Sequence, residues 1–357
     1  MKHRFVRISF ICWLALIFAP VHAKLIMRPV INELPASWAI AVSPEQQLWV
    51  SNRKGTLRRY TLQGELVGQY ALDLPDLYYK GQGGLMAIAF PPDYAKTKWV
   101  YLSYSFGSDA KNGLKVIRVQ VNDNPQQTLI ETIFEQEDLR DTPVHYGARI
   151  AFLQDASLLV SIGDGFDYRE QAQKDNSQLG KILQIFPDKV VSTYSKGHRN
   201  AQAFAVLDDG SVFSHEHGPD GGDEINLLEK SVNYGWPIIT FGKDYIGGLI
   251  SPFTEYPNMR QADFDWTPSI APSGMIYYAN NRFAELSNTL LVTSLKFQQM
   301  HSVKLTNEQA IKKPQQESIY FAKSGYRLRD ITQSSNGRIF ILGDGSNASI
   351  FEVMQSN

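Results

Sequence analysis

The sequence predicts an all-β protein, and within that class a six-bladed β-propeller. Most of the chain consists of short apolar or alternating runs separated by Gly, Pro, Asn and Asp, which is the pattern of β-strands joined by turns. The strand-and-turn pattern recurs at intervals of roughly 50 residues, a period that is typical of propeller blades. Helical periodicity is short wherever it occurs. The repeat alone leaves two alternatives open, a seven-bladed propeller and a pair of β-sandwiches.

Six repeat units carry the prediction, and each has a polar turn followed by an apolar strand. The strands are Leu48–Ser51, Lys98–Ser103, Leu158–Ser161, Ser211–Ser214, Leu290–Thr293 and Arg338–Ile341. The longest interval, between the fourth and fifth units, contains an insertion over Asn233–Ala271. The best candidates for helix are Arg169–Ile185 and Asn280–Leu286.

Residues 1–23 are typical of a cleavable secretory signal peptide. A basic start is followed by the apolar run Ile8–Pro20 and by Val21-His22-Ala23, which fits a small-x-small cleavage pattern. We therefore expect a secreted protein with a single domain over residues 24–357 and no stable membrane span after cleavage. The only cysteine, Cys12, lies inside the signal, so we expect a mature chain without disulfides that is stabilised by its core and its closure, with a bound metal as a further candidate.

The charge of the mature chain argues against a nucleic-acid partner. The signal contains three of the 35 Lys and Arg residues and no acidic residue, so 32 basic residues face 36 acidic ones, a net charge of −4. The aromatic content of 12% supports a large buried interior.

The segment Ser214–Trp236 is the richest in chemistry. Its 23 residues include two histidines, five acidic residues and four glycines. Flexible, oxygen-rich loops of this kind suit Ca²⁺ better than Zn²⁺. His215-Glu216-His217 also permits a zinc interpretation, but the sequence places no third nitrogen or sulfur ligand beside the two histidines. A polar turn between two strands is the structural alternative.

Other polar clusters precede and follow this segment. His145 is a candidate general base, and Asp164, in Gly163-Asp164-Gly165, could orient it. Arg199 and Asn200 follow His198 and offer a planar cationic fork and an amide. Gly81-Gln82-Gly83-Gly84 allows a ligand to approach the backbone closely. Taken singly, each cluster is equally compatible with a turn or a structural residue.

Three basic residues near the C-terminus form a candidate anion site. Lys296 follows an apolar strand, and Arg327 and Arg329 stand two residues apart, on one face of an extended chain. Together they could bind a ligand with several carboxylates through charge-assisted hydrogen bonds. The structural alternative is a solvated sheet edge.

The order of these motifs resembles the soluble aldose sugar dehydrogenases of the glucose/sorbosone dehydrogenase family, which depend on pyrroloquinoline quinone (PQQ). The resemblance extends from about Ile31 to the C-terminus and is most specific over Glu216–Trp236, which begins Glu-His-Gly-Pro and ends Asn-Tyr-Gly-Trp. It implies a periplasmic six-bladed propeller that oxidises the anomeric carbon of an aldose to a lactone. It also implies a periplasmic electron acceptor, a cytochrome or a quinone path.

The resemblance further implies roles for individual residues. His145 matches the general base, and Asp164 matches an acid of the pocket beside it. Residues that match positions holding PQQ, or lying beside them, are Gln82, Arg199, Asn200, Tyr245, Leu295, Lys296, Phe297, Arg327, Leu328 and Arg329. Gly218 and Pro219 match positions whose carbonyl groups help to hold a cofactor-linked Ca²⁺, and Glu224 and Tyr234 match a structural Ca²⁺ site.

Two other functions compete with this interpretation. A Ca²⁺-dependent propeller that hydrolyses sugar lactones would need the metal and a base, but it would have no use for cations that converge on a tricarboxylate. A secreted glycan-binding propeller would keep Ca²⁺ for stability and would have no use for His145. Fold alone does not separate the three, because propellers host many functions.

Overall fold

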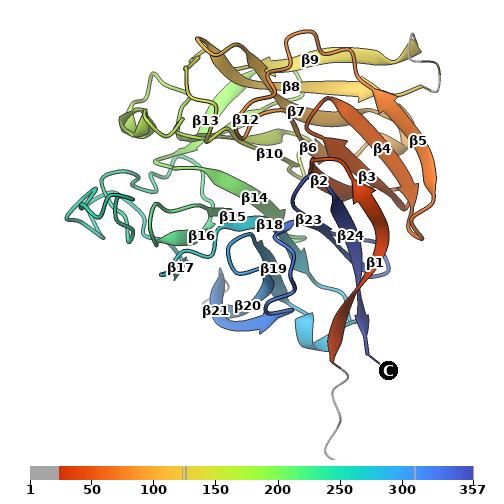
Figure 1. Cartoon of the computed structure of the whole chain (residues 1–357). Coiled ribbons are helices and arrows are strands. Elements are labelled where there is room, and N and C mark those ends of the chain that lie inside the picture. Colours follow the sequence, from red (N-terminus) through yellow and green to blue (C-terminus); the bar gives the residue numbers. More distant parts are fainter. Residues whose placement is uncertain (1–23, 123, 125–126, 309–310, 357) are drawn as a thin grey trace, which may run out of the picture.

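The computed structural model describes residues 24–122, 124, 127–308 and 311–356, and these form a six-bladed β-propeller (Figure 1). Each blade in the described chain is a four-stranded antiparallel sheet, and the predicted fold class is confirmed. The predicted signal peptide, residues 1–23, lies outside the described residues.

The blades follow one another along the chain, and each runs from an inner strand at the axis to an outer strand at the rim (Figure 1). Blade 1 contains β2 (Ser37–Val42), β3 (Gln47–Asn52), β4 (Thr56–Thr61) and β5 (Leu66–Ala71). Blade 2 contains β6 (Leu85–Ala89), β7 (Val100–Gly107), β8 (Asn112–Gln120) and β9 (Leu129–Glu135). Blade 3 contains β10 (Gly147–Phe152), β11 (Leu158–Ile162), β12 (Lys181–Ile185) and β13 (Val191–Lys196).

The second half of the ring repeats this order. Blade 4 contains β14 (Ala201–Val206), β15 (Val212–Glu216), β16 (Asp223–Leu227) and β17 (Phe264–Trp266). Blade 5 contains β18 (Pro272–Tyr278), β19 (Thr289–Ser294), β20 (Gln299–Glu308) and β21 (Ile311–Tyr320). Blade 6 contains β22 (Leu328–Gln333), β23 (Ile339–Gly343), β24 (Ala348–Gln355) and, as its outer strand, β1 (Leu25–Leu34).

The two ends of the described chain close the ring. Strand β1 pairs antiparallel with β24, from Leu25 opposite Gln355 to Leu34 opposite Ala348. One blade is therefore built from both ends of the sequence, and the described termini lie side by side (Figure 1). This pairing joins the start of the described chain to the last blade and so holds the ring closed.

The second strand of every blade lies at the centre of the packing. These strands are β3, β7, β11, β15, β19 and β23, and they coincide with the six apolar runs that define the repeat units in the sequence. Strands β11, β15, β19 and β23 are buried along their whole length. Because both faces of such a strand are covered by neighbouring blades, most of its residues are apolar, and this explains why it is visible in the sequence.

Hydroxyl groups on several second strands link one blade to the next. Ser51 Oγ accepts a hydrogen bond from Ala39 N (3.1 Å) in its own blade and donates to Met86 O (2.5 Å) in the following blade. Ser103 and Ser161 make the equivalent pair of bonds. At the equivalent position of blade 4, opposite Ala203, the chain carries His215 instead.

The two helical predictions are wrong for most of their length. Over Arg169–Ile185 the structure has a 3₁₀ helix at Arg169–Gln173 (η2) and then strand β12, and over Asn280–Leu286 it has a 3₁₀ helix at Ala284–Leu286 (η3). The other described helix is the single turn α1 (Tyr94–Thr97). Burial of β12 between two blades outweighs the helical periodicity that its residues share with the preceding turn.

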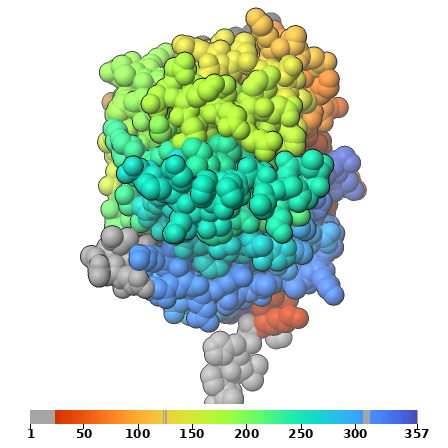
Figure 2. All heavy atoms as spheres, turned by 90° about the vertical axis from the view of Figure 1, so that its left-hand side faces the viewer, coloured from red at the N-terminus to blue at the C-terminus, as the bar shows by residue number. Residues whose placement is uncertain are grey.

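The predicted insertion is present, and it lies inside blade 4. Residues 228–263 connect β16 to β17 without a strand of the sheets. In Figure 2 blade 4 and this connection (teal) occupy the middle of the face, between blade 3 (green) and blade 5 (blue).

Candidate active site

A cavity of about 540 Å³ opens at one end of the propeller. Its lining residues lie where inner strands begin or second strands end, because antiparallel order brings these positions to the same end of each blade. Gln82 precedes β6, His145 precedes β10, Arg199 and Asn200 precede β14, and Arg327 precedes β22. Residues that are far apart in sequence are therefore brought together around the axis.

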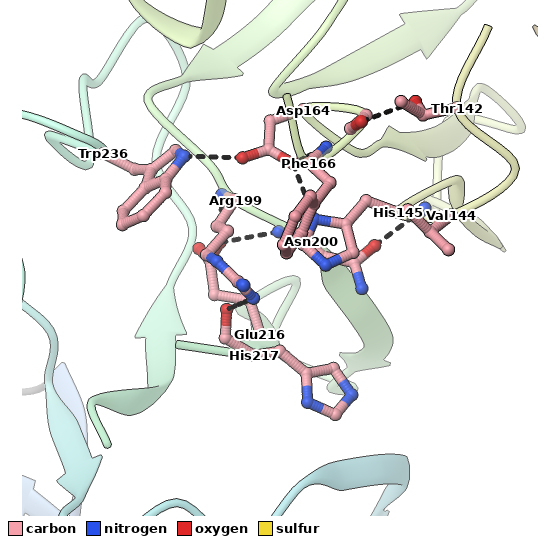
Figure 3. A network of polar contacts seen from close by, with 12 residues as sticks. Thr142, Val144, His145, Asp164, Phe166, Arg199, Asn200, Glu216, His217 and Trp236 are labelled. Atoms are coloured by element: carbon pink, nitrogen blue, oxygen red, sulfur yellow. Dashed lines mark hydrogen bonds and ion pairs between the residues drawn. The ribbon is translucent and has the colours of Figure 1, made fainter. Parts of the chain in front are cut away.

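His145 is the candidate base, and its ring orientation is fixed. Its Nδ1 lies 2.7 Å from Asp164 Oδ1, which leaves Nε2 as the nitrogen available on the cavity side (Figure 3). The side chain is 7% exposed. Burial lowers the pKa of His145 below its ordinary value, and the nearby Arg199 charge adds to this, while Asp164 opposes it. The imidazole is therefore neutral near pH 7, as a general base must be.

Asp164 is buried and fully hydrogen-bonded. Its Oδ2 accepts a hydrogen bond from Trp236 Nε1 (2.8 Å), and its Oδ1 also accepts one from Phe166 N (2.8 Å) (Figure 3). Burial raises the pKa of Asp164, but the hydrogen bond and charge of His145 and the charge of Arg199 outweigh burial and keep this pKa below its ordinary value. Asp164 is thus a carboxylate that orients the imidazole and can stabilise its protonated form.

The backbone of His145 is held in an unusual conformation by its neighbours. Its φ is 52°, in the left-handed region, and its N–H donates to Gln82 Oε1 (2.8 Å). Gly163 packs against it so closely that a Cβ there would meet His145 O at 2.0 Å. Asn200 Oδ1 accepts a hydrogen bond from Gly147 N (3.0 Å), two residues further on. Predicted cofactor residues therefore also position the predicted base.

Four arginines and one carboxylate give the cavity a positive charge. The arginines in its lining are Arg53, Arg199, Arg327 and Arg329. Asp344 lies between two of them, with Oδ2 3.0 Å from Arg327 Nε and Oδ1 3.0 Å from Arg329 Nε. Burial raises the pKa of Asp344, but the two guanidinium groups outweigh burial and hold this pKa below its ordinary value. The excess of cations favours an anionic ligand.

A buried network holds Arg199 and Asn200 in place. Glu216 Oε2 accepts hydrogen bonds from the main-chain N–H groups of Arg199 (2.5 Å) and Asn200 (3.3 Å). Its Oε1 lies 2.9 Å from His198 Nδ1, and His198 Nε2 lies 2.8 Å from Ser195 Oγ. The order Ser, His, Glu has the pattern of a hydrolase triad, but Ser195 and His198 are 1% exposed and do not line the cavity. The network is thus a support for the residues above it.

Comparison with known proteins identifies the family. Residues 34–352 match the sequence model of the family described as glucose/sorbosone dehydrogenase. The chain belongs to this family.

Individual members of the glucose/sorbosone dehydrogenase family are similar over nearly the whole chain. Aldose sugar dehydrogenase YliI of Escherichia coli is 29% identical over 350 residues, covering 91% of this chain and 92% of the relative. Quinoprotein glucose dehydrogenase B of Acinetobacter calcoaceticus is 24% identical over 416 residues, covering 89% and 85%. The solved PQQ-bound form of an aldose sugar dehydrogenase from Streptomyces coelicolor has a TM-score of 0.73 and 26% identity, covering 94% of this chain and 99% of that one.

The residues predicted to bind metal in this chain lie beside the main cavity. Gly218, Glu224 and Tyr234 line a separate small cavity of about 10 Å³, together with Glu216. Burial raises the pKa of Glu224, and the charge of Glu216 raises it further. Tyr234 OH is already bonded, donating to Leu227 O (2.7 Å), so this residue has only its carbonyl to offer. Arg199 and His217 also line this cavity, and the void, of about one water volume, has room for a single small cation beside the two acidic side chains.

Side chains alone do not form a metal centre in the part of the chain that the structure describes. Within the described chain, no three His, Cys, Asp or Glu side chains gather closely enough to hold a metal ion. Pro219 lines a third, neighbouring cavity, and His217 lines the main one. The alternate histidines His215 and His217 therefore do not share a site, because His215 is buried in blade 4.

The other residues that the sequence predicts to hold the cofactor are divided between the cavity and its surroundings. Tyr245 and Leu295 line the cavity, the first at 61% exposure. Lys296 and Phe297 are exposed next to Leu295 and are not part of the lining, and the Lys296 Nζ lies 5.6 Å from the centre of the Phe297 ring. Leu328 is fully buried in the core below Arg329 and is also not part of the lining.

Several lining residues are not predicted from the sequence. These are mainly Trp38, Arg53, Gln202, His217 and Asp344. One of them has a signal, because Gly343-Asp344-Gly345 repeats the Gly163-Asp164-Gly165 motif at the end of another second strand. No described helix is long and apolar enough to cross a membrane.

Proposed function

We propose that the protein is a periplasmic aldose sugar dehydrogenase that uses PQQ and Ca²⁺, oxidises the anomeric carbon of an aldose to a lactone, and has His145 as its general base. One observation carries this proposal: a neutral, carboxylate-oriented histidine faces a cavity lined by four arginines. Family membership supports a sugar dehydrogenase, and the PQQ-bound relative and the quinoprotein relative support the cofactor.

The proton of the anomeric hydroxyl would pass to His145 Nε2. Because Nδ1 is bonded to Asp164, the imidazolium that results has its charge opposed by a buried carboxylate. Trp236 keeps that carboxylate oriented by donating to its second oxygen. General-base assistance of this kind contributes about 10²–10⁴-fold to a rate.

The arginines would hold the carboxylates of PQQ. Arg327 and Arg329 are aligned by one shared carboxylate, Asp344, and Arg199 is aligned by the carbonyl of His217 (3.1 Å). Such pre-aligned guanidinium groups match carboxylates through paired, charge-assisted hydrogen bonds. When bound, PQQ supplies the acceptor for the hydride from the sugar C1, and Ca²⁺ polarises the quinone carbonyl.

Each turnover leaves two electrons that must go to an acceptor. We propose a periplasmic cytochrome or a quinone path for this role, consistent with the predicted signal peptide. The net charge of −4 expected for the mature chain supports a partner other than nucleic acid.

Reconstitution tests the proposal. The purified protein is mixed with PQQ and Ca²⁺, and reduction of a dye acceptor is followed over a panel of aldoses. Activity that requires both additions, and that falls at least about 10²-fold in His145→Gln while PQQ binding is retained, is the expected result. The matched control is His301→Gln, because His301 is another buried histidine paired with a carboxylate, Glu317, but lies outside the cavity.

Two outcomes would overturn the proposal. Failure of the wild-type protein to bind PQQ at micromolar concentration with Ca²⁺ present would show that PQQ is not its cofactor. Lactone hydrolysis without PQQ would indicate the hydrolase alternative. Equal activity of His145→Gln and His301→Gln would show that His145 is not the general base.

A further inference from the structure

A buried arginine outside the main cavity contacts the segment that carries His145. Arg140 is 2% exposed and is not part of the cavity lining. Its Nη2 donates to His145 O (3.3 Å) and to Val144 O (3.4 Å). Its guanidinium carbon lies 4.4 Å from the centre of the Tyr146 ring. One side chain therefore contacts three consecutive residues, and the middle one is the proposed base.

The same arginine packs against the segment that carries Asp164. Gly165 lies so close to it that a Cβ there would meet Arg140 Cδ at 2.4 Å and Arg140 Nε at 2.8 Å. Thr142, two residues after Arg140, donates from its Oγ1 to Gly165 O (2.6 Å) (Figure 3). Arg140 thus lies between the segment that carries the base and the segment that carries its carboxylate.

The main chain of Arg140 is anchored at the start of β8. Arg140 N donates to Asn112 O (3.0 Å), and Asn112 N donates to Arg140 O (2.7 Å). The side-chain oxygen of Asn112 accepts a hydrogen bond from Tyr146 OH (2.6 Å). One buried residue of blade 2 therefore fixes both the arginine and the ring that its guanidinium group contacts.

Packing alone does not account for the charge of this side chain. Both hydrogen bonds of the Arg140 guanidinium group go to carbonyl groups, and within the described chain its Nε and Nη1 have no hydrogen-bond partner. A buried cation with so few partners costs free energy, and an apolar side chain of similar size would avoid that cost. Burial lowers the pKa of Arg140, and nearby groups that include Asp164 oppose this effect. The charge is therefore better explained by its place beside the His145–Asp164 pair.

We propose that Arg140 is a positioning residue for the proposed base, because it holds the main chain of His145 in its left-handed conformation and places a fixed positive charge behind the His145–Asp164 pair. This inference rests on the proposed function, since it takes His145 as the base. A residue other than glycine keeps a φ of 52° only where its surroundings enforce it. The contacts of Arg140 with the carbonyl groups before the Tyr146 ring, and with that ring, provide such surroundings.

The charge of Arg140 acts on the imidazole together with other groups. Burial lowers the pKa of His145, Asp164 opposes this, and the charges of Arg199 and Arg140 lower the pKa further. His217 is another titratable group that interacts with His145. Because a guanidinium group keeps its proton wherever a histidine titrates, its effect on the imidazole is constant. Removing this charge should raise the pKa of His145, since the protonated imidazole is no longer repelled.

The first readout is the titration midpoint of the His145 imidazole in the full-length protein without cofactor. Nitrogen NMR of protein with isotope-labelled histidine follows the titration, and the signal that is missing from His145→Gln belongs to His145. We expect Arg140→Gln to raise the midpoint by about one pH unit, because the amide keeps a donor for the carbonyl groups but has no charge. Arg140→Lys keeps the charge and should leave the midpoint within about 0.3 pH units of wild type.

The second readout is dye reduction by the protein reconstituted with PQQ and Ca²⁺. We expect kcat to fall about 10-fold in Arg140→Lys, because one ammonium group cannot contact two carbonyl groups and the Tyr146 ring at once, and about 10²-fold in Arg140→Gln. KM should change by no more than about 3-fold, since Arg140 does not line the cavity. Arg118→Gln is the matched control, because its guanidinium carbon also lies 4.4 Å from the centre of an aromatic ring, that of Trp99, but outside the cavity.

A wild-type kcat in Arg140→Lys, or a wild-type midpoint in Arg140→Gln, would overturn the inference. Equal effects of Arg140→Gln and Arg118→Gln would also overturn it. Either variant of Arg140 is sufficient for the test if the other does not fold. If the wild-type protein reduced no dye with PQQ and Ca²⁺, the proposed function itself would have failed, and the midpoint, which is measured without cofactor, would still test the link between Arg140 and His145.

Discussion

Replacing His215 by serine should remove an acid sensitivity that is built into blade 4. His215 is fully buried, and within the described chain neither ring nitrogen has a hydrogen-bond partner. Burial lowers its pKa to about 3, and the charge of Arg149 adds to the effect. Serine is the residue that Ser51, Ser103 and Ser161 place at the equivalent position of blades 1, 2 and 3, so the backbone of the fold accommodates it.

The size of the effect follows from linkage. The unfolded chain binds a proton at His215 near pH 6.5, whereas the folded chain does not until about pH 3, so the folded state loses stability as the pH falls through this interval. At about pH 5 the loss amounts to about 2 kcal/mol, and above about pH 7 it vanishes. The smaller side chain of serine leaves a cavity, but the cost of that cavity is the same at every pH.

The assay is urea unfolding of wild type and His215→Ser at about pH 7.5 and about pH 5. Contributions from all other titrating groups are common to both proteins and cancel in the difference. We expect this difference to change by about 2 kcal/mol in favour of the serine variant on acidification. A difference that is the same at both pH values would show that His215 is protonated in the fold or has a partner there, and it would refute the reasoning.

Three further predictions concern the active site. Asp164→Asn should lower kcat by about 10²–10⁴-fold in dye-reduction kinetics without abolishing PQQ binding, because the amide cannot hold the imidazole tautomer or oppose its charge, and a loss below about 10-fold would contradict this role. Because burial lowers the pKa of His145, the acid limb of the kcat/KM profile should have its midpoint below pH 6.5, and a midpoint above 6.5 would contradict a buried, neutral base. Glu224→Gln should reduce the rise in melting temperature that Ca²⁺ gives over a chelator, since it removes one of the two carboxylates at the small cavity, whereas Glu229→Gln, an exposed neighbour, should leave that rise unchanged.

The sequence was sufficient for the blades because their second strands are covered on both sides. A strand such as Leu158–Ile162 is apolar except for Ser161, and turn residues mark its ends. The closing strand β1 was not predictable in this way. It lies at the rim, alternates irregularly between buried and exposed, and pairs with residues more than 300 positions away. Pairing of this range leaves no local pattern in a sequence.

The residues of the candidate site also differ in how readily the sequence reveals them. His145, Asp164, Arg199 and Arg329 stand in polar clusters at strand ends, where charge and glycine are unusual enough to be noticed. Trp38 gave no such signal, because a tryptophan in an apolar strand is typical of a core, and in the structure Trp38 belongs to the hydrophobic core as well as to the cavity lining.

The same arrangement explains how a repeated fold acquires one asymmetric site. All six blades bring equivalent positions to the same end of the axis. The cavity wall therefore contains residues that occupy the same position in different blades. The first strand of every blade has one extra residue at this point, and in blades 1, 4 and 6 the unpaired residue, which is Trp38, Gln202 and Arg329 respectively, is part of the cavity lining. The side chains at these positions have contacts of their own, because Gln202 Nε2 donates to Gly147 O and Asn200 Oδ1, and Arg329 Nε donates to Asp344 Oδ1. One position of the repeat therefore contributes different side chains to the cavity in different blades, and His215, where blades 1, 2 and 3 have serine, is a second position at which one blade departs from its neighbours.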